Sequence, residues 1–89
     1  MALIHLTIVT PEGKYYDGDA QRIVVRTTGG DVAILPHHID YSAALVEQGE
    51  ARVIEPDGRV RHGELKGGLL HVASDNVQVI TNGFQWKEA

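Results

Sequence analysis

Histidine and carboxylate side chains are the groups in this sequence that could do chemistry. The densest cluster is the run His37-His38-Ile39-Asp40, and three further histidines stand alone: His5, His62 and His71. Zinc prefers imidazole nitrogen and carboxylate oxygen, so a small histidine-rich metal-binding β-barrel is one hypothesis. Adjacent side chains on a strand point to opposite faces, however, so His37 and His38 share an ion only in an irregular backbone. A loop histidine beside a packing histidine is the simpler interpretation, and we predict no metal site.

Other patterns that carry chemistry are incomplete. Asp17-Gly18-Asp19 resembles a fragment of a calcium loop, but the glutamate at the twelfth position of such a loop is missing, which favours a turn. Neither a Gly-x-Ser-x-Gly nor a Gly-x-x-x-x-Gly-Lys-Ser/Thr motif is present, so the sequence predicts no nucleophile elbow and no phosphate-binding loop. These observations indicate a binding or assembly module without a cofactor rather than an enzyme.

Size and charge narrow the possibilities further. The chain has 89 residues and no cysteine, which is enough for one domain and excludes a disulfide framework. Its formal net charge of −4 argues against nucleic-acid binding. We expect no signal peptide, because the first residues lack a basic region and a long apolar run, and no stretch approaches the ~20 apolar residues of a membrane span.

Short apolar runs alternate with turn signals along the chain. Leu3 to Val9 alternates between apolar and polar residues, and two hairpins are predicted at Pro56-Asp57-Gly58 and Ser74-Asp75-Asn76. Gly67-Gly68 precedes a strand and predicts a bulge or a close approach of two backbones. The rhythm as a whole predicts an all-β fold, a two-sheet β-sandwich or flattened barrel of about ten short strands.

Two segments have no clear period. His38 to Gln48 fits a helical repeat poorly, so we expect a loop that leads into a strand over Ala43 to Glu47. Phe84 to Ala89 holds the only tryptophan and the only phenylalanine, and we expect a tail or the start of a linker. The predicted domain therefore covers residues 1–83, followed by a tail over residues 84–89.

The stretch from Gly29 to His38 combines a glycine turn, a short apolar strand and a proline stop. Gly30 allows the turn because glycine enters positive φ without steric cost. Pro36 ends the strand because it cannot donate a backbone hydrogen bond. Asp31 and His38 bracket the strand, and we expect both to lie at one exposed end of the domain.

Four segments in order resemble the N-terminal β-sandwich domain of the epsilon subunit of F-type ATP synthases, called delta in mitochondria. Their order and spacing, rather than any one motif, carry the resemblance over nearly the whole chain. The segments are Val9-Thr10-Pro11-Glu12-Gly13 with Tyr16-Asp17-Gly18; Ile23-Val24-Val25 with Gly30-Asp31-Val32-Ala33-Ile34-Leu35-Pro36 and His38; Ala44-Leu45 with Gly49; and Gly67-Gly68-Leu69-Leu70-His71-Val72 with Val77-Gln78-Val79-Ile80-Thr81.

The resemblance implies a non-catalytic rotor subunit. Such a domain packs against the gamma subunit, rests on the ring of c subunits, and passes proton- or sodium-driven rotation to the catalytic head. It also implies a peripheral position at the cytoplasmic face of the bacterial cell membrane, without a transmembrane segment. Carried over onto this sequence, the expected c-ring contacts are Asp31 and His38. The expected structural turn positions are Gly30, Pro36, Gly67 and Gly68.

This sequence departs from the family pattern in two places. The family usually has glycine between the proline and the histidine, where this chain has His37, and often Ala-Pro after the histidine, where it has Ile39-Asp40. Family members usually continue into a C-terminal helical hairpin that can inhibit ATP hydrolysis and in some cases binds ATP. The chain stops at Ala89, so we expect neither self-inhibition nor ATP binding. A generic β-sandwich adaptor for another assembly is the remaining alternative.

Overall fold

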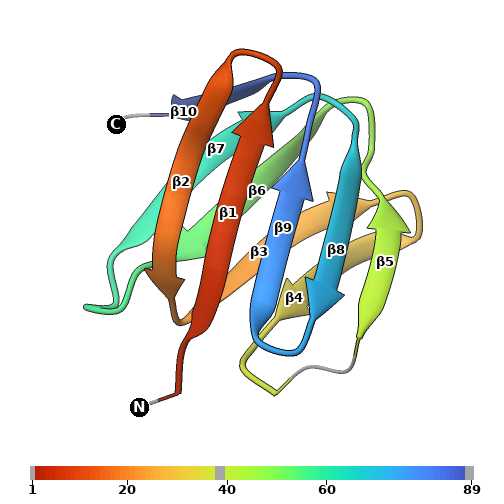
Figure 1. Cartoon of the computed structure of the whole chain (residues 1–89). Helices are drawn as coiled ribbons and strands as arrows, with labels where there is room; N and C mark the ends of the chain where they lie inside the picture. The colour runs from red at the N-terminus through yellow and green to blue at the C-terminus, as the bar shows by residue number, and fades with distance from the viewer. Residues whose placement is uncertain (1, 38–39, 88–89) are drawn as a thin grey trace.

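The computed structural model describes residues 2–37 and 40–87, which form ten strands and no helix. They make two five-stranded sheets, ordered β2-β1-β9-β8-β5 in the first sheet and β10-β7-β6-β3-β4 in the second, which stack as two layers (Figure 1). The predicted all-β sandwich is confirmed. The strands are β1 (Ile4–Thr10), β2 (Gly13–Ala20), β3 (Arg22–Thr27), β4 (Gly30–Ile34), β5 (Tyr41–Ala44), β6 (Gly49–Ile54), β7 (Val60–Leu65), β8 (Leu69–Ala73), β9 (Asn76–Ile80) and β10 (Phe84–Lys87).

One apolar core fills the space between the sheets. In β1 the residues Ile4, Leu6 and Ile8 are buried while His5 faces solvent, as the alternation predicted. The inward residues of β9, Val77 and Val79, are buried in the same way. Burial of such a side chain stabilises the fold by roughly 1.5–3 kcal/mol. The apolar residues at every second position of each strand therefore favour packing of the two sheets against each other.

The first strand lies in the middle of its sheet, between β2 and β9. It runs antiparallel to β2 but parallel to β9, with Ile8 opposite Val79. Among the described residues, every other strand pair is antiparallel. The parallel pair therefore joins the beginning of the chain to a strand more than sixty residues later.

Strand β2 occupies a place where the sequence predicted a turn. Asp17-Gly18-Asp19 belongs to β2 and pairs with residues 5–7 of β1. Because β2 is an edge strand, its outward side chains remain in water, and charged residues are tolerated there. The prediction was wrong because Asp-Gly favours a turn locally, whereas β1 supplies a pairing partner from elsewhere.

The predicted strand over Ala43 to Glu47 is also displaced, because β5 ends at Ala44. The Leu45 N–H donates to Gly68 O at 2.9 Å, and the next N–H, of Val46, donates to Arg26 O at 3.3 Å. Gly68 adjoins the first sheet and Arg26 belongs to the second. The backbone thus crosses between the sheets here instead of continuing as one strand.

Residues 84–87, predicted as the start of a tail, form strand β10 and pair with β7. The Phe84 side chain is buried. Its ring lies against Gly63 of β7, where an added Cβ would collide with it. A glycine on the neighbouring strand makes room for this ring, so the sandwich extends past residue 83. The local sequence pattern could not predict this, because the space is made by a residue on another strand.

Candidate interaction surfaces

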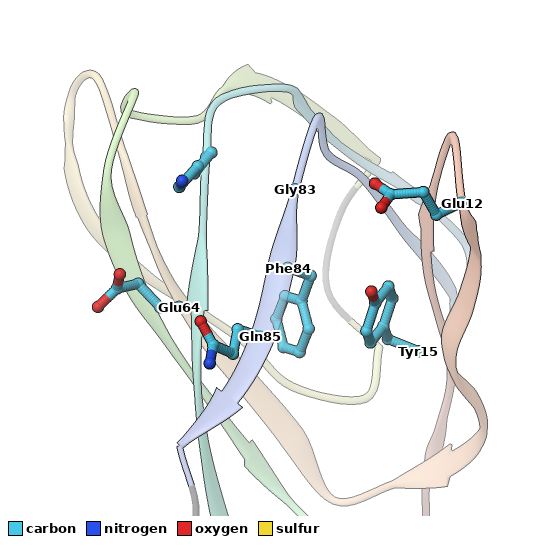
Figure 2. Close-up of a pocket in the computed structure, with 7 residues that line it drawn as sticks. Glu12, Tyr15, Glu64, Gly83, Phe84 and Gln85 are labelled. Carbon is cyan, nitrogen blue, oxygen red and sulfur yellow. The ribbon is translucent and has the colours of Figure 1, made fainter.

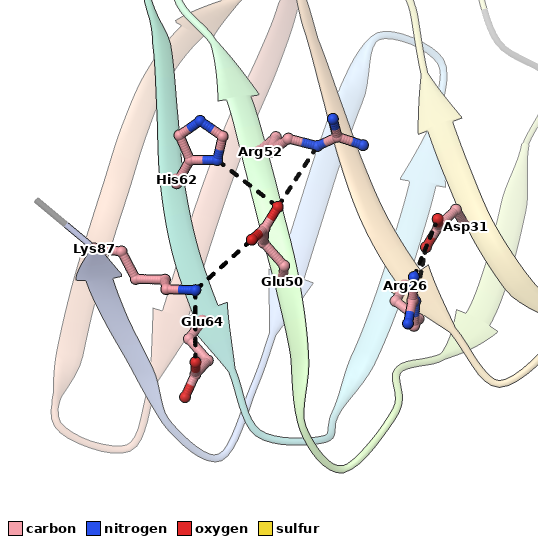
Figure 3. Close-up of polar contacts among 7 residues, drawn as sticks. All are labelled: Arg26, Asp31, Glu50, Arg52, His62, Glu64 and Lys87. Carbon is pink, nitrogen blue, oxygen red and sulfur yellow. Dashed lines mark hydrogen bonds and ion pairs between the residues drawn. The ribbon is translucent and has the colours of Figure 1, made fainter. Parts of the chain in front are cut away.

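Asp31 begins β4 directly after the turn from β3. Gly30 has a φ of 119° in this turn, a conformation that suits glycine alone. The Asp31 carboxylate accepts a hydrogen bond from Arg26 Nε at 2.9 Å (Figure 3), and this bond lowers the pKa of Asp31 below its ordinary value. Both side chains are more than half exposed. The pair is therefore an accessible, solvent-screened charge site.

The other end of β4 carries Pro36 and His37. His37 has a φ of 66°, which costs a non-glycine residue of order 1 kcal/mol or more. Its N–H donates to Asp75 Oδ1 at 2.8 Å, which ties this loop to the turn between β8 and β9. His38 lies outside the described residues. Asp31 and His37 flank opposite ends of β4, and the expectation that Asp31 and His38 share one exposed end of the domain stays a prediction.

Gly67 and Gly68 have φ values of 64° and 111°. A Cβ at Gly68 would collide with the carbonyl oxygen of Ile80, so the backbones of two segments touch at this point. The buried hydroxyl of Thr81 holds the same region. It donates to Gly67 O at 2.7 Å, and the Lys66 N–H donates to Gly83 O at 3.0 Å. Together these bonds hold the loops before β8 and β10 against each other.

The histidines of the described residues do not converge. His5 on β1 lies 3.0 Å from Asp17 Oδ1, and the Lys14 hydrogen bond, followed by that of His5, lowers the pKa of this carboxyl. His71 Nδ1 on β8 lies 2.9 Å from Ser42 Oγ, and His62 belongs to the second sheet. No group of three residues with metal-binding side chains is found in residues 2–37 and 40–87.

An apolar row crosses the outer face of the first sheet. Leu69 and Ile80 pair across β8 and β9, and Leu69 is 51% and Ile80 47% exposed. The neighbouring strands extend the line on both sides. We call this set the apolar row: Val9, Ile80, Leu69 and Ala44. Sequence reasoning missed it, although Ile80 lies on the opposite face of β9 from the core valines, which was the available signal.

The outer face of the second sheet is charged instead. Glu50 lies at the centre, 3.8 Å from Arg52 Nε and 3.7 Å from both His62 Nδ1 and Lys87 Nζ. Lys87 also lies 3.9 Å from Glu64 (Figure 3). These side chains are more than one third exposed, so the network is hydrated and each pair contributes little to stability.

Aromatic side chains close the corner where β2 meets β10. The Phe84 ring centroid lies 5.5 Å from that of Tyr15 and 4.8 Å from that of Trp86. Trp86 Nε1 donates to Tyr15 O at 3.3 Å, and the guanidinium of Arg61 lies 3.8 Å from the centroid of the Trp86 ring. These contacts join the edge strands of the two sheets and use the aromatic residues that the sequence had placed in a tail.

Comparison with known proteins identifies the source of this architecture. The family model for the ATP synthase delta/epsilon chain beta-sandwich domain matches residues 3–87. The chain belongs to this family. The ATP synthase epsilon chain of Frankia casuarinae is 35% identical over 77 residues, which cover 86% of this chain and 89% of that relative. The family accounts for the order of strands and turns that the sequence displays.

Longer relatives match as well. The epsilon chain of Caldanaerobacter subterraneus is 33% identical over 84 residues, covering 94% of this chain and 60% of that relative. That of Bacillus velezensis is 35% identical over 89 residues, covering 100% of this chain and 66% of that relative. The chain thus spans less than two thirds of the length of these two relatives, and the match falls on the β-sandwich.

Solved structures share the fold. A chain in the Euglena gracilis mitochondrial ATP synthase, solved as OSCP/F1/c-ring, superposes with a TM-score of 0.89 at 22% identity, covering 97% of this chain and 54% of that chain. A chain in the central stalk/c-ring structure from Tetrahymena thermophila gives 0.74 at 18% identity, with coverages of 91% and 64%. The described residues contain no helix long and apolar enough to span a bilayer.

Proposed function

We propose that this chain is a non-catalytic rotor subunit in the central stalk of an F-type ATP synthase. It couples rotation of the c ring to the catalytic head through the gamma subunit. The observation that carries the proposal is the family match over residues 3–87, together with relatives that are named epsilon chains. The proposed location is peripheral, on the cytoplasmic face of the bacterial cell membrane, and the coupling ion is a proton or a sodium ion.

The proposed mechanism is mechanical. A subunit that transmits torque must resist deformation, and a close-packed core between two hydrogen-bonded sheets does so because packed interiors have low compressibility. The Gly68 contact and the Thr81 hydroxyl lock the loops at one end, and the aromatic corner locks the edge between β2 and β10. The body therefore turns as one piece between its partners.

We assign the gamma contact to the apolar row. Leu69 and Ile80 are each about half exposed, and covering such side chains releases about 25 cal/mol for each Å² of apolar surface removed from water. Covering the charged outer face of the second sheet would not release free energy in this way, because its ion pairs would have to be desolvated. Partner burial is thus favoured on the first sheet.

We assign the c-ring contact to Asp31 and His38. Asp31 is exposed and held by Arg26, so it can accept hydrogen bonds from a partner without rearrangement. Because β4 is an edge strand, the proposal is that the ring lies along β4 rather than against a single turn.

Reconstitution tests this assignment. The chain is mixed with gamma and with a c ring in detergent at moderate ionic strength, and complexes are separated by size. We expect a stable complex with gamma and a weaker contact with the ring that Asp31→Ala disrupts. The same variant should unfold within about ±0.5 kcal/mol of the parent, since the site is exposed. Failure to associate with gamma would contradict the proposal, and a large loss of stability in Asp31→Ala would make that residue structural.

A further inference from the structure

A small cavity lies beside the aromatic corner, between the β1–β2 turn and strand β10 (Figure 2). Its volume is about 210 Å³, which is the space of about seven water molecules at ~30 Å³ each. None of its lining residues belongs to the apolar row or to the Asp31 turn, so the cavity uses side chains that neither proposed subunit contact uses. The lining residues are Glu12, Tyr15, Glu64, Lys66, Gly83, Phe84 and Gln85.

Aromatic rings and a glycine give the cavity its shape. The rings of Tyr15 and Phe84 stand next to each other with centroids 5.5 Å apart (Figure 2), and Tyr15 is 36% exposed. The nearest atoms that a Cβ added to Gly83 would meet belong to the aliphatic stem of Lys66, at 3.6–3.9 Å. The Lys66 N–H donates to the Gly83 carbonyl at 3.0 Å. Residue 83 therefore adds no side chain to the hollow, and a large side chain there would extend into the space beside Lys66.

The two carboxylates that line the cavity, of Glu12 and Glu64, differ in whether they have a cation as partner. Glu64 lies 3.9 Å from Lys87 Nζ, so a cation outside the cavity already engages it. The carboxylate of Glu12 makes no ion pair with any other described residue and lies on the rim across the Phe84 ring from Glu64 (Figure 2). Lys66 is the single cation of the lining. The two carboxylates and one ammonium leave a net negative lining beside aromatic rings.

We propose that this cavity binds a guanidinium or ammonium group carried on a short alkyl chain. Glu12 pairs with the charge, and the rings of Tyr15 and Phe84 contact the alkyl chain and the planar cation, an arrangement in which carboxylate and cation–π attraction act together. The site goes beyond the rotor role, since neither the gamma nor the ring contact uses it. The same chemistry is offered by a free alkylguanidine and by an arginine side chain of a partner protein.

Titration of the folded chain with agmatine, followed in ¹H–¹⁵N NMR spectra, tests the proposal. We expect saturable shifts confined to residues 12–15, 64–66 and 83–85, with a dissociation constant on the order of 1–10 mM for a ligand of this size. The neutral analogue N-butylurea should cause no saturable shift at the same residues. Equal shifts with both compounds would show that the charge is not recognised, and would overturn the proposal.

Variants separate binding from folding. Glu12→Gln should weaken agmatine binding about fivefold, the size of one exposed ion pair, and Lys66→Met should strengthen it by a factor of about two because a competing cation is removed. Gly83→Leu should abolish it by filling the hollow. Glu47→Gln is the matched control: Glu47 borders a neighbouring hollow on the far side of Lys66, so the same loss of charge should leave binding within about twofold.

Two sources of the ligand are distinguished in the same titration. A capped tripeptide with a central arginine presents the guanidinium as a partner protein would. Binding of the peptide at least as tight as that of agmatine identifies an arginine anchor site, and binding of agmatine alone identifies a site for a free cation. Binding that Glu12→Gln and Glu47→Gln weaken equally would reduce the effect to general charge attraction and would refute the assigned site. None of these outcomes depends on association with gamma.

Discussion

The outer faces of the two sheets have the same strand geometry but carry different side chains, apolar on the first sheet and charged on the second. On the first sheet Leu69 and Ile80 stand side by side in the apolar row. On the second sheet the corresponding outward positions carry Glu50, Arg52 and His62, with Glu50 within 4 Å of each of the other two side chains. Covering a hydrated ion network with a partner releases little free energy, whereas covering exposed Leu and Ile side chains releases much more. The sandwich therefore has one face suited to a permanent partner and one suited to water.

The largest effect is expected from a charge in the apolar row. Ile80→Asp should weaken the complex with gamma by a factor of 100 or more, because a carboxylate would be buried without a partner. Val60→Asp is the matched control, since Val60 is also 47% exposed but belongs to β7 in the second sheet. Calorimetric titration with gamma measures both. Equal weakening by the two variants would remove the distinction between the faces.

A second test compares the two sides of a single strand. Val79 is buried and Ile80 is exposed on β9. Val79→Ala should lower the free energy of unfolding by about 1–4 kcal/mol through the lost contacts and the cavity left behind, whereas Ile80→Ala should stay within about 0.5 kcal/mol. Urea unfolding followed by tryptophan fluorescence gives both values. A large loss for Ile80→Ala would mean that the apolar row supports the fold rather than a partner.

The charged face should respond weakly to mutation. Glu50→Gln removes the centre of the network, and we expect a loss of at most about 1 kcal/mol at low ionic strength that shrinks as salt is added. Urea unfolding at two salt concentrations measures it. Affinity for gamma should stay unchanged in this variant, and a tenfold drop would assign the charged face to the interface instead.

The smallest effect concerns the pH response of Asp31. Its pKa is lowered by the Arg26 hydrogen bond. A carboxyl with a depressed pKa in the folded state stabilises the fold above its unfolded value of about 3.9, and this contribution is lost as the pH falls through the lower folded value. Asp31→Asn should flatten the decline in stability below about pH 4 relative to the parent protein. Parallel curves for both proteins would show that the pair adds nothing.

Local patterns predicted the parts of the fold that depend on local causes. The alternation of β1 and the turn at residues 56–58 appear in the structure where the sequence indicated them, and the turn predicted at 74–76 is found at residues 74–75. Three features depend on distant partners and were missed: β2 needs β1, the crossing at Leu45 needs Gly68, and β10 needs the space above Gly63. A repeat of apolar residues every two or four positions describes one segment of the chain. It does not show which other segment that one will contact.

The candidate surfaces divide in the same way. Exposure of Asp31 follows from a glycine turn that the sequence displays. The apolar row and the cavity beside Phe84 depend on register between strands that are far apart in the chain. Register is a property of two paired strands. The sequence of β9 alone therefore predicts which face of the sheet Ile80 lies on, but not which residues lie beside it.

The parallel pair of β1 and β9 bears on how the protein is made. β1 is synthesised before β9, so one of its two pairing edges remains open until residues near 80 have been synthesised. Non-local pairing of this kind slows folding to milliseconds or longer. During that time the unpaired edge of β1 is open to pairing with other chains. A partner that recognises the paired strands of the first sheet therefore binds only after β9 has been synthesised.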